Sequence, residues 1–271
     1  MKKHLLILSG IIALAMVTTL SAQTAQDGLA KVVSLKGAAR FMAVTGAEWK
    51  PIKVGMVLRP GALIQTAADS YVDVVLNNTK ATQGLGSALT DEPASGAAAS
   101  ASASASDDGY KPKAVQDAIR IFENSVLSVD KLTVTQTGAD TVTETQLDLK
   151  AGRIFGTVKK LSAASIYEIK VPNGVAGIRG TIYLIGAEGV VSVLTGSVVV
   201  SYVSNGTVIT KEVPAGFQFN PATGQVTQIT NPVLKQIMKL AKAFDKYVQV
   251  PATTYVHDNT VYNVSPTTTK K

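Results

Sequence analysis

The sequence of 271 residues contains no cysteine. This absence excludes a disulfide framework, a thiolate metal site and a lipid-modified cysteine. Histidine is almost as scarce, because the whole chain has only His4 and His257. His4 falls in a predicted signal peptide and His257 in a predicted polar tail, so we expect no histidine triad, two-histidine metal site or HExxH zinc helix. We therefore predict no metal and no cofactor.

The first residues predict a secretory signal peptide over residues 1–22. A basic start precedes a mostly apolar run at residues 5–20, and the small residues Ser21 and Ala22 suit a cleavage site. The apolar run is too short to span a membrane, and no stop-transfer pattern follows it. We expect the protein to be exported to the bacterial periplasm, the cell surface or the extracellular space.

The charge balance is modestly basic, with 26 Lys+Arg against 19 Asp+Glu and a formal net charge of +7. The basic residues form no arginine-rich stripe with interleaved aromatics, and export also argues against a nucleic-acid partner. An anionic glycan or lipid headgroup surface fits this charge. A soluble basic protein with no such partner fits it better, and we prefer that interpretation.

Most segments after the signal peptide alternate on a two-residue period, as in Val72, Val74 and Leu76. This period predicts half-buried strands. Turn residues recur at short intervals, and Asn205-Gly206 between two β-rich runs predicts a tight hairpin. We predict an all-β domain over residues 23–230, as a sandwich, barrel or solenoid-like stack of short antiparallel strands.

One segment, residues 81–112, interrupts this rhythm with small and acidic residues, including a run of alternating alanine and serine. Such a composition buries too little apolar area to offset the entropy lost on ordering. We interpret it as a flexible insert extruded from one domain. The alternative is a linker between two domains.

Near the C-terminus the apolar period becomes helical, which predicts an amphipathic helix over residues 231–249. Asn231 suits the N-cap and Pro232 the first helical position. The helix is expected to cover an open sheet face; the alternative is that it lies on an anionic membrane surface. Residues 250–271 are expected to form an extended polar tail. The polar side of the helix carries Lys235, Lys239, Lys242 and Lys246.

Carboxylate pairs are the remaining route to catalysis, as in glycoside hydrolysis. Acidic pairs in the insert have no surroundings that could tune their pKa values, and those on predicted strands are expected to face outward. The glycine-rich "GVAGIRG" is followed by strand-like residues and not by a helix, so it is no phosphate loop. We predict no catalytic residues. The acidic residues in question are Asp91, Glu92, Asp107 and Asp108 in the insert and Asp130, Asp148 and Glu168 beside strands.

Several stretches resemble, in order, the FecR domain of bacterial envelope proteins. They are "WKPIKVGMVLRPGALIQTAADSYVDVVL", "LDLKAGRIFGTV", "YEIKVPNGVAGIRGTIYLI" and "VPAGFQF" within residues 49–219. The resemblance implies an all-β periplasmic module that senses or transmits a signal, in the founding case for iron uptake through an anti-sigma regulator. Those regulators contact a sigma factor through a cytoplasmic segment that precedes a membrane span. This sequence shows only a signal peptide at that place, so we expect no sigma-factor contact here. The signature residues, which we interpret as structural, are Gly174, Gly177, Arg179, Gly180 and Thr181.

Two of the residues singled out have competing interpretations. A guanidinium has five donors, so we predict that Arg179 staples the joint between two strands by collecting carbonyls or pairing with a strand carboxylate. The alternative is an anion site. Trp49, the only tryptophan, is interpreted as a core or edge anchor, and the alternative is a ligand contact.

Three functional hypotheses follow from these observations. The first is a non-enzymatic exported envelope protein whose FecR-like domain binds or senses a partner protein, a glycan or a small ligand. The second is a structural or scaffolding protein of the cell envelope or surface, whose lysines touch an anionic polymer. The third is a carboxylate-dependent glycan hydrolase.

Overall fold

The computed structural model describes residues 25–77, 111–114, 116–137, 140–204, 206–245, 254–257 and 260–263. The predicted signal peptide, residues 1–22, lies outside the described residues. So does the predicted insert, residues 81–112, apart from Lys111 and Pro112.

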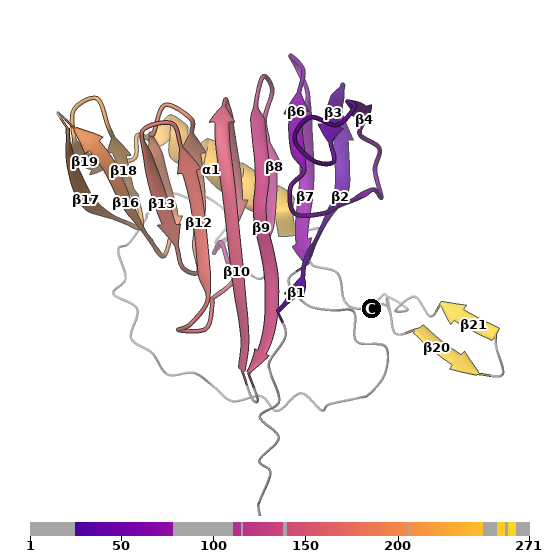
Figure 1. The fold of residues 1–271 in the computed structure, drawn as a ribbon. Coiled ribbons are helices and arrows are strands. Elements are labelled where there is room, and N and C mark those ends of the chain that lie inside the picture. Colours follow the sequence, from indigo (N-terminus) through magenta and orange to yellow (C-terminus); the bar gives the residue numbers. More distant parts are fainter. Residues whose placement is uncertain are drawn as a thin grey trace, which may run out of the picture.

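The described chain is built mainly from two β-sheets (Figure 1). In the ten-stranded sheet, nine strands follow one another along a single path, and β1 (Gln26–Asp27) pairs with β9 off this path. The order along that path is β17 (Thr207–Pro214), β16 (Ser197–Ser204), β13 (Gly174–Ile178), β12 (Ile166–Val171), β10 (Asp140–Ala151), β9 (Val126–Thr137), β6 (Leu63–Thr66), β3 (Ala39–Met42) and β4 (Lys50–Pro51).

The second sheet has nine strands and packs against the first. Its order is β19 (Gln225–Gln228), β18 (Phe217–Asn220), β15 (Val191–Thr195), β14 (Ile182–Gly186), β11 (Arg153–Thr157), β8 (Ala118–Ile121), β7 (Tyr71–Asn77), β2 (Leu29–Lys36) and β5 (Val57–Leu58).

Apolar side chains from both sheets form one core between them. Leu147 and Leu149 of β10 meet Val72 and Val74 of β7 in this core, and all four are buried. Alternate residues of a strand point to opposite faces, so each sheet directs one apolar row inward. The all-β prediction is confirmed, and the architecture is a sandwich.

One strand pair departs from the antiparallel prediction. β10 and β12 run parallel, with Glu144 opposite Ile166 and Asp148 opposite Lys170. A parallel pair needs a crossover connection. Here the chain supplies it by passing through β11, which belongs to the other sheet. The predicted hairpin around Asn205-Gly206 is confirmed, because β16 and β17 pair antiparallel across it.

The single helix among the described residues, α1 (Asn231–Phe244), lies across the outer face of the nine-stranded sheet (Figure 1). Ile237, Leu240, Ala241 and Phe244 are buried against that sheet. The prediction that the helix covers a sheet face is confirmed, which makes the fold three layers deep.

The ends of the helical segment differ from expectation. Thr230, and not Asn231, takes the N-cap position, with extended backbone and no side-chain cap bond, while Pro232 occupies the first turn as predicted.

In the expected tail, β20 (Thr254–His257) and β21 (Thr260–Asn263) pair as a two-stranded sheet. No helix in the described part of the chain is long and apolar enough to cross a membrane.

Candidate functional site

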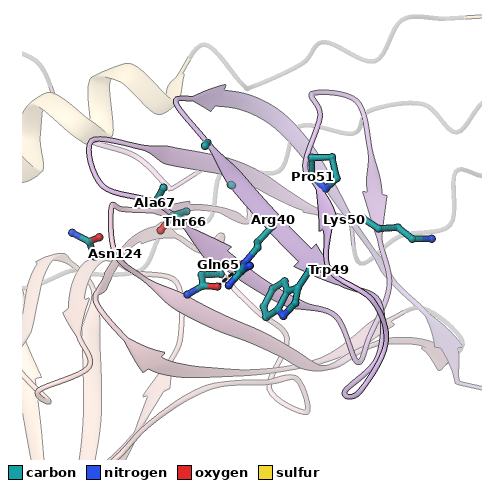
Figure 2. A pocket seen from close by; sticks show the side chains of 10 residues that line it. Arg40, Trp49, Lys50, Pro51, Gln65, Thr66, Ala67 and Asn124 are labelled. Atoms are coloured by element: carbon teal, nitrogen blue, oxygen red, sulfur yellow. Dashed lines mark hydrogen bonds between the residues drawn. The ribbon is translucent and has the colours of Figure 1, made fainter.

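An open cleft lies at the β4 edge of the ten-stranded sheet (Figure 2). Its volume is about 560 Å³. Its walls are formed by the neighbouring strands β6, β3 and β4 and by the turn at Asn124, just before β9. The lining residues are Ala38, Ala39, Arg40, Trp49, Lys50, Pro51, Gln65, Thr66, Ala67 and Asn124.

Arg40 is the organising side chain of this cleft. Strand pairing places Arg40 of β3 directly opposite Gln65 of β6, so both side chains lie on the same face. Arg40 Nε donates a hydrogen bond of 2.8 Å to Gln65 Oε1. Its guanidinium carbon also lies 4.5 Å from the centre of the Trp49 ring, in a cation–π contact. Figure 2 shows the two groups side by side.

Trp49 is therefore neither a core residue nor an isolated surface residue. It is partly buried, immediately precedes β4, and lines the cleft with Arg40 across its ring. The edge-anchor interpretation and the ligand-contact interpretation are compatible with this position. The ligand contact of Trp49 stays a prediction.

The far wall is held in place by a buried hydroxyl. Thr66 Oγ1 donates to the Phe122 carbonyl oxygen and accepts from the Ser125 N–H at 3.0 Å. These bonds fix the turn that carries Asn124, whose φ of 53° is left-handed. The Asn124 side chain is exposed at the cleft. Because the Thr66 hydroxyl is engaged and buried, it is not available as a nucleophile.

The cleft is electropositive and contains no catalytic constellation. Among the described residues, its charged lining residues are Arg40 and Lys50, and no described carboxylate lines it. The groups that remain are amides, one indole and small apolar side chains. This set can bind a polar or anionic ligand and can stack on a ring, but it holds no acid–base pair for hydrolysis.

The carboxylates on strands lie elsewhere. Asp130 is exposed, while Asp148 and Glu168 are partly exposed, which agrees with the outward orientation that we expected. Asp130 pairs with Lys170 at 3.2 Å, and Asp148 pairs with Lys150. The acidic pairs of the insert lie outside the described residues. Across the residues that the structure places, no cluster of three or more metal-ligating side chains occurs.

One buried acid was missed by the sequence analysis. Asp117 is 3% exposed and accepts the Lys159 N–H at 2.8 Å. Burial raises the pKa of its carboxyl, and the Lys159 hydrogen bond and charge oppose that shift only in part. Nearby, the hydroxyls of Tyr167 and Tyr183 lie 3.3 Å apart in the core, where burial raises the pKa of both phenols. No lining residue of the cleft belongs to this group.

The signature glycines have different surroundings. A Cβ on Gly174 would lie 2.5 Å from the Ser201 carbonyl oxygen, so β13 and β16 approach closely only because that residue is glycine. Gly180 has a φ of 70°, which side chains of L-residues rarely adopt. Gly177 is less constrained, because its nearest neighbour, the Val199 carbonyl oxygen, would lie at an ordinary 3.7 Å.

Arg179 does not form the buried, many-carbonyl staple that we expected. Its side chain is exposed, and within the described residues it donates to one carbonyl, Ser162 O, at 3.3 Å. The exposure follows from its place in the turn just after β13. Thr181, which is fully buried, makes the firmer tie: its hydroxyl donates to Ser197 O at 3.0 Å, and its N–H and C=O both bond Val158. None of these residues lines the cleft.

Sequence analysis found Trp49 but missed its partners. Arg40, Gln65 and Asn124 are scattered polar residues without a motif, and nothing in their spacing predicts that they meet. The only available signal was the two-residue period, which would place Arg40 on one face of a strand. The partner strand, and hence Gln65, follows only from the sheet order.

The fold and the cleft describe an all-β sandwich protein with an open polar site at one sheet edge. A family model described as FecR protein matches residues 113–199 of the chain. The match confirms the resemblance over that span and contains all the signature residues. Of the cleft, it contains only Asn124.

Other comparisons are less informative. No curated protein matches this chain. Two crystal structures of a candidate anti-sigma factor from Parabacteroides distasonis, at 1.65 and 2.50 Å resolution, match at 15% identity with TM-scores of 0.32 and 0.31. Each alignment covers 44% of this chain and 54% of the other, so the chain spans about half the length of those structures.

Proposed function

We propose that the protein is a non-enzymatic binding module of the bacterial envelope and that the cleft at Trp49 is its ligand site. The observation that carries this proposal is the Arg40 guanidinium, held against the Trp49 ring and by Gln65 at the wall of an open cleft. The FecR domain over residues 113–199 supports a sensing or binding role.

A binding role fits the chemistry of the cleft better than catalysis does. Hydrolysis of a glycan needs two carboxyl groups at a defined separation across the substrate. None lines the cleft, and three carboxylates on the outer face of the ten-stranded sheet pair with lysines: Asp130, Glu144 and Asp148.

The position of the cleft also suits a sensor. Its walls come from β3, β4 and β6 and from the Asn124 turn, which leads into β9 at the start of the FecR match. A ligand that bridges these walls would couple the N-terminal strands to the FecR domain. The envelope location rests on the signal-peptide pattern of residues 1–22.

A second candidate is a scaffolding protein that adheres to an anionic surface. It is favoured by the outer side of α1, where Lys235, Lys239 and Lys242 are exposed; Lys246 lies outside the described residues. Attraction between these lysines and an anionic polymer would be weak and sensitive to salt.

Calorimetric titration of the mature protein with soluble oligosaccharides, both neutral and acidic, tests the first candidate. We expect saturable binding of at least one of them, lost in Trp49→Ala at an unchanged unfolding temperature. Co-sedimentation with purified cell wall and with phosphatidylglycerol vesicles tests the second. Sedimentation that requires the three lysines, together with no binding by the cleft, would replace the proposed function with scaffolding.

A further inference from the structure

The charge and geometry of the cleft point to a ligand class. Resting on the proposed function of this site, we propose that the cleft selects acidic saccharides and that Arg40 binds a carboxylate of a uronic-acid unit. The argument depends on the preorganisation of Arg40, on the charge of the lining and on the nature of the neighbouring side chains.

The Arg40 side chain is exposed, and two contacts orient its guanidinium group. Its Nε donates to Gln65 Oε1 at 2.8 Å, and its guanidinium carbon lies over the Trp49 ring, 4.5 Å from the ring centre. Guanidinium has five N–H donors, so this arrangement leaves the two terminal nitrogens as a fork. Such a fork matches the two oxygens of a carboxylate, and its prior fixation lowers the entropy lost on binding.

No acidic side chain in the cleft competes for this fork. The lining residues include Arg40 and Lys50 and no Asp or Glu. The ion pairs recorded among the described residues involve other cations. A ligand carboxylate would therefore meet two positive charges and no negative one among the described lining residues.

The remaining lining favours a saccharide over an acidic peptide. Gln65 and Asn124 carry amides, which both donate and accept, as sugar hydroxyls do. The part of the indole left uncovered by Arg40 offers an apolar surface for the C–H groups of a sugar ring. A peptide would ordinarily add as a strand to the sheet edge, but the edge strand β4 contains Pro51, which has no N–H to donate.

The test uses the fluorescence of Trp49, which is the only tryptophan in the chain. Trigalacturonate is titrated against its methyl ester, which has the same sugar backbone without the charges, and against triglutamate. We expect a saturable change in emission with trigalacturonate alone. Arg40→Gln should weaken that binding at least about tenfold, whereas Arg59→Gln, which removes an exposed charge outside the cleft, should leave it within about twofold.

Arg40→Lys keeps the charge but removes the fork, so its affinity should fall between those of the wild type and Arg40→Gln; unfolding temperatures control for folding. Equal binding of the methyl ester would overturn the selection for acid and leave the proposed function standing. Equal binding of triglutamate would overturn the assignment to saccharides. No response to trigalacturonate up to about 10 mM would overturn the inference, while another oligosaccharide bound at Trp49 would keep the proposed function.

Discussion

At the residue scale, the core contains a carboxyl group that is costly to ionise. Asp117 is buried beside the Tyr167–Tyr183 pair, and burial raises the pKa of its carboxyl above the usual 3.8. The folded protein therefore holds this proton more tightly than the unfolded chain does. The stability that results is fully present below the unfolded pKa and is lost as the pH rises through the folded pKa.

Asp117→Asn should remove this pH dependence, because the amide oxygen can still accept the Lys159 N–H but no charge develops. The free energy of unfolding of the variant should increase relative to the wild type as the pH rises above about 4. Urea unfolding at a series of pH values measures the difference. Parallel profiles for the two proteins would show that Asp117 ionises freely in the fold.

Substitution by alanine should affect the stability of the protein differently at Gly174 and at Gly177. Gly174→Ala places a Cβ 2.5 Å from the Ser201 carbonyl oxygen and forces β13 away from β16, which should cost about 1–3 kcal/mol. Gly177→Ala meets ordinary contacts and reduces the entropy of the unfolded chain, so it should be neutral or slightly stabilising. Chemical denaturation compares them, and equal losses would contradict this account of the strand spacing.

Arg179 and Thr181 form a second comparison within the signature. Arg179→Lys should change stability by less than about 0.5 kcal/mol, because the side chain is exposed. Thr181→Val should cost about 1–3 kcal/mol, since it removes the donor to Ser197 O in a buried position. The midpoints of thermal unfolding rank the two variants. A larger loss of stability in Arg179→Lys than in Thr181→Val would show that Arg179 contributes more than Thr181 to the joint between β13 and β14.

At the scale of elements, aromatic and cationic contacts hold the C-terminal end of α1 against the nine-stranded sheet, in addition to the apolar side chains along the helix. Phe244 packs edge-on against Phe155 of β11, with ring centres 5.0 Å apart. Arg120 of β8 lies 5.4 Å from the Phe244 ring and 4.0 Å from Tyr71, and donates to both oxygens of Asp73 at 2.6 and 2.7 Å. These contacts fix the C-terminal end of the helix over β7, β8 and β11.

Phe244→Ala should therefore destabilise the protein by about 3–5 kcal/mol, the usual cost of removing a buried phenylalanine. Lys239→Ala on the exposed side of the same helix is the matched control, and we expect a change below about 0.5 kcal/mol. Urea unfolding followed by far-UV circular dichroism measures both. If the two variants behave alike, α1 is not part of the cooperative unit.

The sequence predicted individual elements well and their partners poorly. The alternation in β7 and the helical period of α1 identified both, because each depends on neighbours within one element. The parallel pairing of β10 with β12 and the meeting of Arg40 with Gln65 depend on how distant segments align. Arg179 lies at the joint between two strands as predicted, but apolar neighbours in the sequence do not reveal that its side chain is exposed there and donates, within the described residues, to one carbonyl, Ser162 O.

At the scale of the whole molecule, a polar cleft opens at the sheet edge formed by β4. Mostly apolar side chains fill the space between the sheets and α1 covers the outer face of the second sheet, whereas the cleft is lined by residues at the edge of the first. Residues 113–199, which the FecR family model matches, supply the central strands, and the N-terminal strands add the cleft beside them (Figure 1).

The most direct test of this account is the indole N–H resonance of Trp49 in a ¹H–¹⁵N spectrum, which is unique because the chain has one tryptophan. Titration with trigalacturonate should shift this resonance to saturation, at the same concentrations at which calorimetry records binding. An unmoved indole resonance during calorimetrically detected binding would place the ligand elsewhere and contradict the assignment of the cleft as the binding site.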